Sequence, residues 1–274
     1  MNFPSDEYLL DLVYIALCAG EAILDIYERD DHGIQTKADD SPVTLADLAA
    51  HQVILDGLQK LAPDIPILSE ESDPVAYQER RSWQRYFLVD PLDGTKEFIN
   101  RNGEFTVNIA LIEDGEATKG VVHAPAKKLY YVGNKEANLA YVFRNGYRTT
   151  FSAKKPAQTP LTVVASRRHG GEALEACMAA LRKEFAQVNT TSLGSSLKLC
   201  MVAEGQADLY PRLAPTSEWD TAAAQAVLEA AGGLVVDEQM QPLRYNTKED
   251  LLNPSFYALG DKEYDWQSVL SLAR

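Results

Sequence analysis

The segment LVDPLDGTKEF, residues 88–98, places two acidic side chains three residues apart at the end of an apolar run. Asp90 closes the run, and Pro91 and Gly94 turn the chain so that Asp93 can face back toward Asp90. Taken alone, the same pattern is that of a solvated turn after a strand. It indicates a paired-carboxylate site only in company with other acidic residues.

Two further acidic residues lie at the ends of predicted elements. Glu70 follows the β-type run IPIL, and Asp220 precedes a predicted helix in EWDTAAA. Together with Asp90 and Asp93 they offer hard oxygen ligands without histidine or thiolate, which favours Mg²⁺ or Mn²⁺ over Zn²⁺. Because four carboxylates in one cleft repel one another, they need divalent cations to stay ionised together, and charge balance suggests two to three ions.

Two threonines stand at predicted helix starts near these acids. A short helix is predicted over 95–100, and its first N–H groups would point into the cleft, where such groups bind phosphate. Thr95 can equally be only the N-cap of that helix. Thr44 and Asp47 have the spacing of a capping box, so Asp47 also has a purely structural interpretation.

The hydrophobic pattern predicts the elements that must position these residues. Apolar residues at helical spacing predict a helix over 5–28 and a second that begins after Thr44 and ends before Pro63, and the two should form one layer. Strand-like runs cover 65–68 and 85–90. The segment from Thr106 to Tyr147 predicts an antiparallel meander, because β-rich runs alternate with turn residues.

The polar, proline-bearing segment 152–160 predicts a join between two lobes, with domains at 1–155 and 156–274. The first lobe would carry most of the metal ligands. Beyond the join, strands alternate with helices, which indicates an α/β lobe. Its predicted strands are 161–166, 207–211, 234–237 and 256–260, and its predicted helices are 172–185, 195–204, 221–231 and a terminal helix from Asp261.

Composition narrows the class of protein. The 274 residues carry 26 Lys and Arg against 40 Asp and Glu, a net charge of −14, which argues against a nucleic-acid or anionic-membrane surface. Cys18, Cys177 and Cys200 are odd in number and lack CxxC spacing, so neither a disulfide framework nor a thiolate zinc site is expected. No apolar stretch approaches the roughly 20 residues of a membrane span, and we expect a cytoplasmic protein.

The segments KADDSPVTLAD, LSEES, DPLDGTKEF and WDTAA, in this order and spacing, resemble the signature segments of the inositol-monophosphatase-like superfamily of Mg²⁺-dependent, lithium-sensitive phosphatases. The resemblance covers nearly the whole chain from Lys37 onward. Within the superfamily, DGTKEF, GSSLK (194–198) and LYPR (209–212) resemble the bacterial 3′(2′),5′-bisphosphate nucleotidase branch.

This resemblance implies a layered α/β (α+β) protein, an alternating αβαβα sandwich like that of the inositol monophosphatases and fructose bisphosphatases. It also implies hydrolysis of adenosine 3′,5′-bisphosphate to AMP and phosphate in sulfur metabolism. Whether the sulfated nucleotide PAPS is a further substrate stays open at this point. The implied ligand is thus a small nucleotide bisphosphate and not nucleic acid.

The resemblance assigns roles to the acidic residues position by position. Glu70, Asp90 and the main-chain carbonyl of Leu92 would hold one Mg²⁺. Asp90, Asp93 and Asp220 would hold a second, and Glu70 with waters a third. Thr95 and Asp47 would orient a water molecule for attack and accept its proton, which favours the catalytic interpretation of Asp47 over the capping one.

Substrate choice needs further groups, because the metal ligands alone would serve any phosphomonoester. A second phosphate on an acidic protein needs local cations, for which Lys198, Arg212, Arg167 and His169 are candidates. A surface or capping role is an equal alternative for each of them. The implied substrate-binding set is Glu70, Leu92, Asp93, Gly94, Thr95, Ser166, His169, Ser195, Ser196, Lys198, Arg212 and Asp220.

Two positions depart from the superfamily pattern: Ser69 and Ala224 stand where many relatives have glycine. Two rival functions also stay open, an inositol or sugar phosphate monophosphatase and a non-catalytic divalent-cation-binding module. The pair Thr95 and Asp47 argues against the non-catalytic module, since a purely structural cation site would not need it. The sequence leaves open 3′ against 2′ cleavage, monomer against homodimer, and peripheral association with the inner membrane face.

Overall fold

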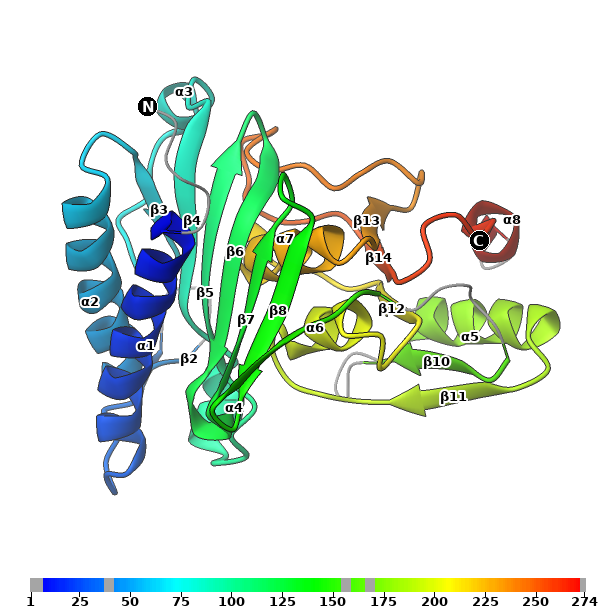
Figure 1. Cartoon of the computed structure of the whole chain (residues 1–274), viewed down its shortest axis with the longest axis horizontal. Coiled ribbons are helices and arrows are strands. Elements are labelled where there is room, and N and C mark those ends of the chain that lie inside the picture. The colour runs from blue at the N-terminus through cyan, green and yellow to red at the C-terminus, as the bar shows by residue number, and fades with distance from the viewer. Residues whose placement is uncertain (1–6, 37–41, 154–158, 166–170, 272–274) are drawn as a thin grey trace.

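The structure is a computed structural model that describes residues 7–36, 42–153, 159–165 and 171–271. Helices and sheets alternate in five layers, αβαβα, as expected from the sequence (Figure 1). The outermost layer consists of α1 (Glu7–Tyr27) and α2 (Leu45–Leu61). Both helices bury an apolar stripe against the neighbouring sheet, and the second begins after Thr44 and ends before Pro63, as predicted.

The second layer is a seven-stranded sheet in the order β3-β4-β5-β6-β7-β8-β9. β3 is parallel to β4 and every later pair is antiparallel, which confirms the predicted meander. Side chains alternate between its faces, so Phe87 packs toward α1 and α2 and Leu88 toward the molecule's centre. The strands are β3 (Ile67–Ser69), β4 (Arg85–Asp93), β5 (Thr106–Glu113), β6 (Glu116–Ala124), β7 (Leu129–Asn134), β8 (Leu139–Arg144) and β9 (Tyr147–Thr150).

The central layer consists of α6 (Leu197–Ala203) and α7 (Ala222–Ala230). Helix α7 lies directly on β6 and β7, because both strands present glycine where its backbone approaches. A Cβ at Gly120 would overlap the carbonyl oxygen of Ala223, and one at Gly133 would lie 2.5 Å from the Cα of Val227. The end of α7 that follows Asp220 is therefore fixed against the larger sheet.

The fourth layer is a five-stranded mixed sheet in the order β11-β10-β12-β14-β13, and α5 (Glu172–Glu184) and α8 (Trp266–Leu270) cover its outer face. β10 is parallel to β11 and β12, whereas β14 is antiparallel to both of its neighbours. The strands are β10 (Leu161–Val164), β11 (Val188–Thr191), β12 (Leu209–Arg212), β13 (Leu234–Asp237) and β14 (Phe256–Leu259).

Several sequence predictions need correction. The last helix begins at Trp266 rather than Asp261, because Asp265 is its N-cap and the Trp266 indole donates to the carbonyl of Asp261 at 2.6 Å. Strand β11 was not predicted, since its residues VNTT lack an apolar face. The pair β1 (Gln35–Thr36) and β2 (Pro42–Val43) and the helix α3 (Tyr77–Arg80) were also not predicted.

The domain boundary between 155 and 156 stays a prediction. Helix α7 belongs to the second predicted domain, yet it packs on the sheet of the first. Among the described helices, none combines the length and apolar character that a membrane crossing requires.

Candidate active site

The acidic residues meet where β3 and β4 end. The regular pairing of β4 with β5 runs to Asp90 opposite Asn108, and the register then shifts before Asp93. Gly94 follows with φ of 93°, a left-handed conformation that suits glycine, and α4 (Thr95–Ile99) begins directly after it. Asp90 is buried, and its Oδ1 accepts a hydrogen bond from the N–H of Leu92 at 3.0 Å.

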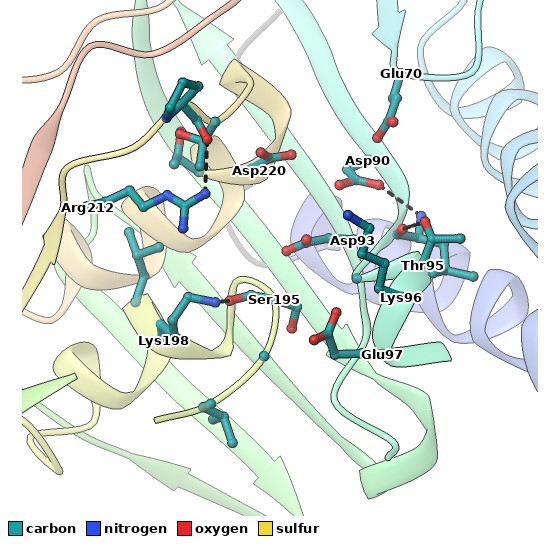
Figure 2. Close-up of a pocket in the computed structure, with 18 of the residues that line it drawn as sticks. Glu70, Asp90, Asp93, Thr95, Lys96, Glu97, Ser195, Lys198, Arg212 and Asp220 are labelled. Carbon is teal, nitrogen blue, oxygen red and sulfur yellow. Dashed lines mark hydrogen bonds between the residues drawn. The ribbon is translucent and has the colours of Figure 1, made fainter. Parts of the chain in front are cut away.

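Three carboxylates from separate elements converge at this point (Figure 2). Glu70 follows β3 and is held beside β4 by its N–H, which donates to the carbonyl of Val89 at 3.1 Å. Asp220 ends a short 3₁₀ turn, Glu218–Asp220, before α7. One oxygen from each of Glu70, Asp90 and Asp220 lies within 4.8 Å of the other two. The convergence expected of these three residues is therefore present.

Burial and mutual repulsion dominate the electrostatics of this acidic cluster. Burial, followed by the charges of Glu70, Asp93 and Asp220, raises the pKa of Asp90 well above its usual range. Burial and the charge of Asp93 raise the pKa of Asp220 in the same way. A cation between the carboxylates would remove this repulsion. The donor set is entirely oxygen, so the acidic cluster fits a hard divalent metal ion.

The capping-box interpretation of Asp47 is confirmed, and the second oxygen of its carboxylate contacts Thr95. Its Oδ2 completes the capping box of α2, accepting from the N–H of Thr44 at 2.8 Å and from the Thr44 hydroxyl at 2.6 Å. Its Oδ1 accepts from the hydroxyl of Thr95 at 3.2 Å. Burial raises the pKa of Asp47, and the hydrogen bonds from Thr44 only partly oppose this shift. One carboxylate thus joins the start of α2 to the start of α4.

A cavity of about 430 Å³ opens beside the acidic cluster. Lys198 and Arg212 lie on the wall formed by α6 and β12 (Figure 2). The Lys198 ammonium donates to the carbonyl of Ser195 at 2.7 Å and lies 5.7 Å from the ring centre of Tyr210. Arg212 donates to the carbonyl of Pro215 at 2.9 Å. Burial lowers the pKa of Lys198, and the charge of Asp93 opposes that shift.

Most of the predicted site residues line this cavity, namely Glu70, Asp90, Leu92, Asp93, Gly94, Thr95, Ser195, Lys198, Arg212 and Asp220. Asp47 lies behind Thr95. Ser166, Arg167 and His169 are outside the described residues.

The expectation that Ser196 faces the substrate is wrong in this structure. Its exposed fraction is 2%, and it lies below the cavity floor against Asp93. Sequence reasoning placed it with Ser195 because the two are adjacent. Ser195 adopts φ of 48°, however, and the turn sends the two side chains in different directions.

Sequence reasoning missed several residues that line the cavity. Lys96 and Glu97 follow Thr95 within the same motif, and Lys96 projects into the cavity (Figure 2). Their signal was available, because a residue next to Thr95 on a one-turn helix must lie near the acidic cluster. The others gave no signal by type or spacing: Pro42, Leu193, Leu199, Pro215, Thr216, Thr221 and Phe256.

Comparison with known proteins places the chain in a class. The model of the inositol monophosphatase family matches residues 6–265, and the chain belongs to this family. Over 250 residues it is 50% identical to the Escherichia coli (strain K12) protein named 3′(2′),5′-bisphosphate nucleotidase CysQ, covering 90% of this chain and 98% of that protein. It is 36% identical to the protein of the same name from Haemophilus influenzae, covering 96% and 97%.

Solved structures of this family have the same fold as this chain. The crystal structure of CysQ from Bacteroides thetaiotaomicron, titled a bacterial member of the inositol monophosphatase family, matches with a TM-score of 0.83 and 42% identity. The match covers 95% of this chain and all of that chain (100%). An IMPase from Thermotoga maritima matches with a TM-score of 0.73 at 22% identity, which supports the fold alone.

Proposed function

We propose that this protein is a Mg²⁺-dependent 3′(2′),5′-bisphosphate nucleotidase that hydrolyses adenosine 3′,5′-bisphosphate to AMP and phosphate. One observation carries the proposal: three converging carboxylates border a cavity whose other wall holds Lys198 and Arg212. A metal site on one side and two cations on the other suit a ligand with two phosphates. The names of the relatives from Escherichia coli and Haemophilus influenzae support this substrate class.

Mg²⁺ fits the donor set, with Mn²⁺ as a substitute. Glu70, Asp90, Asp93, Asp220 and the carbonyl of Leu92 would hold two to three ions, since all five residues line the cavity. When bound, the ions polarise the phosphoryl oxygens, acidify the attacking water and offset the charge of the leaving oxygen. The buried carboxylates supply the negative charge that retains them.

Thr95 and Asp47 would orient the nucleophilic water and take up its proton. The Thr95 hydroxyl donates to Asp47, so its oxygen is left to accept a hydrogen bond from water at the cavity surface. As the water gives up a proton to Thr95, the hydroxyl proton passes to Asp47 Oδ1. Burial raises the pKa of Asp47 and makes it a better proton acceptor than an exposed aspartate.

Lys198 and Arg212 would hold the second phosphate and so select the bisphosphate. The protein carries a net charge of −14, so an anionic substrate must find its cations inside the cavity. Both side chains are anchored through main-chain carbonyls, which reduces the entropy lost on binding. The same arrangement would accept PAPS, which carries its 3′-phosphate on the same ribose.

A comparison of substrates tests this proposal. Purified protein with Mg²⁺ is assayed for phosphate release from adenosine 3′,5′-bisphosphate, PAPS and inositol 1-phosphate. We expect a higher kcat/KM for the adenine nucleotides, and loss of activity after chelation that Mg²⁺ or Mn²⁺ restores. Preference for the inositol ester would refute the substrate assignment. Metal binding without hydrolysis of any ester would leave only the non-catalytic cation-binding alternative.

A further inference from the structure

We propose that Ser196 is a positioning residue that fixes Asp93 and Asp220 relative to each other, so that both can bind one cation. This inference rests on the metal site of the proposed function. It gives Ser196 a role below the cavity and not toward the substrate. No step of the proposed reaction requires contact between this side chain and the nucleotide.

The hydroxyl of Ser196 lies at the junction of three segments. Its Oγ is 2.8 Å from Asp93 Oδ2, 2.7 Å from the main-chain oxygen of Asp220 and 2.8 Å from Asn108 Nδ2. The Ser196 N–H donates to the same Asp93 Oδ2 at 2.6 Å. Ser196 and Asn108 are 2% and 1% exposed. The contacts therefore form in a region that excludes water, where hydrogen bonds are strong.

Counting hydrogens assigns each contact. The amide of Asn108 donates to Ser196 Oγ, which leaves the serine two hydrogens to give, one on its nitrogen and one on its oxygen. The Ser196 N–H donates its hydrogen to Asp93 Oδ2. The hydroxyl proton is then free for the carbonyl of Asp220. Two donors on one residue thus satisfy two acceptors, one on each acid-bearing segment.

The arrangement also decides which oxygen of Asp93 can bind a metal. Within the described part of the chain, the hydrogen bonds to the Asp93 carboxylate all go to Oδ2. Oδ1 is left for the cation. The tight group of carboxylate oxygens contains Glu70, Asp90 and Asp220, and Asp93 lies next to this group. Asp93 is held by Ser196 from below and would meet the cation from its other side.

Ser196→Ala removes the hydroxyl and keeps the backbone N–H. The carbonyl of Asp220 then loses the hydroxyl of Ser196, while Asp93 Oδ2 keeps the N–H of Ser196. We expect the affinity for Mn²⁺, measured by calorimetric titration without substrate, to fall about 10- to 100-fold, the usual effect of removing a partner of a metal ligand. Ser196→Cys keeps a weak donor of similar size and should lose less.

Ser195→Ala is the matched control, because it deletes a hydroxyl from the adjacent residue. The Ser195 hydroxyl makes no hydrogen bond within the described residues, so this variant should bind Mn²⁺ as the unaltered protein does. At saturating metal, Ser196→Ala should keep the KM for adenosine 3′,5′-bisphosphate. Thermal unfolding without metal shows that the variants are folded. If Ser196→Ala does not fold, the comparison rests on Ser196→Cys.

Three results would overturn the inference. Equal Mn²⁺ affinity of Ser196→Ala and the unaltered protein would mean that Ser196 only fills space. A higher KM with unchanged metal affinity would mean that it contacts substrate. Absence of Mn²⁺ binding by the unaltered protein would remove the site itself. Because these titrations contain no nucleotide, failure to hydrolyse adenosine 3′,5′-bisphosphate would refute the proposed function and leave this inference standing.

Discussion

Replacing Asp47 with asparagine separates its capping contact from its proposed role as a proton acceptor. The asparagine Oδ1 can still accept from the N–H of Thr44 and keep the capping box, whereas the amide nitrogen would face Thr95 and cannot accept a proton. We expect turnover to fall about 10² to 10⁴-fold, the range for lost general-base assistance. At 1.36 kcal/mol per decade this is roughly 2.7 to 5.4 kcal/mol of transition-state stabilisation.

The effect on stability should be much smaller. Because the cap is retained, Asp47→Asn should lose less than about 1 kcal/mol of unfolding free energy. Asp47→Ala also loses the Asp47 half of the capping box, whereas Thr44 still accepts from the N–H of Ala46, so the added loss should be at most about 2 kcal/mol. The two variants should therefore share the same low turnover and differ in stability. Thr44→Ala, which removes the cap hydroxyl and leaves the Thr95 contact, should lose about 1 kcal/mol and keep most of the turnover.

The assay follows phosphate release from adenosine 3′,5′-bisphosphate at saturating Mg²⁺, with urea unfolding and Mn²⁺ titration on the same preparations. If Asp47→Asn turns over as fast as the unaltered protein, Asp47 is only a helix cap and the proton path through Thr95 is wrong. If its Mn²⁺ affinity falls in step with turnover, Asp47 builds the metal site instead.

Further predictions concern substrate selection and stability. Lys198→Met or Arg212→Met should raise the KM for adenosine 3′,5′-bisphosphate about 10- to 100-fold, as expected for a lost charge-assisted hydrogen bond, and change that for adenosine 3′-phosphate little; equal effects on both esters would exclude the assigned role. Gly20→Ala would place a Cβ 2.6 Å from the Nδ1 of His123, and urea unfolding should show a loss of about 1 to 3 kcal/mol. Burial lowers the pKa of His123 below its usual 6.5, so the unfolded chain binds more protons below that pH and stability falls as the pH falls. His123→Gln should reduce this dependence of stability on pH by up to about 1.4 kcal/mol per pH unit. Part of the dependence should remain, because burial also lowers the pKa of His51. An unchanged dependence would contradict the assignment to His123.

The sequence predicted the framework of the fold because its local patterns agree with the tertiary structure. Helix α2 begins after Thr44 and ends before Pro63, as these two residues predicted, and the turns of the meander fall between β5 and β9. The strand β11 could not be predicted, because only its pairing with β10 makes the polar run Val188–Thr191 a strand.

Some features of the site could likewise be predicted from the sequence, and others could not. Acidic residues at the ends of β3 and β4 had to converge, because parallel neighbouring strands end at one edge of a sheet. The direction of Ser196 could not be predicted, since it depends on the left-handed backbone at Ser195 and on contacts with Asp93. Sequence offered helix capping and proton transfer as alternatives for Asp47. In the structure Oδ2 makes the capping contact with Thr44, and Oδ1 accepts from Thr95, which leaves room for the proposed proton path as well.

Because the backbone of α7 lies directly on the glycines of the larger sheet, substitutions in that sheet can impair catalysis without touching the cavity. Where side chains separate a helix from a sheet, they can change rotamer to accommodate a larger residue. At Gly120 and Gly133 the nearest atoms belong to the backbone of α7, which cannot rearrange in this way. A methyl group at either glycine must displace the helix and move Asp220 away from Glu70 and Asp90. Inactivating substitutions can therefore arise on strands whose residues never touch cation or nucleotide, and a survey confined to the cavity would overlook them.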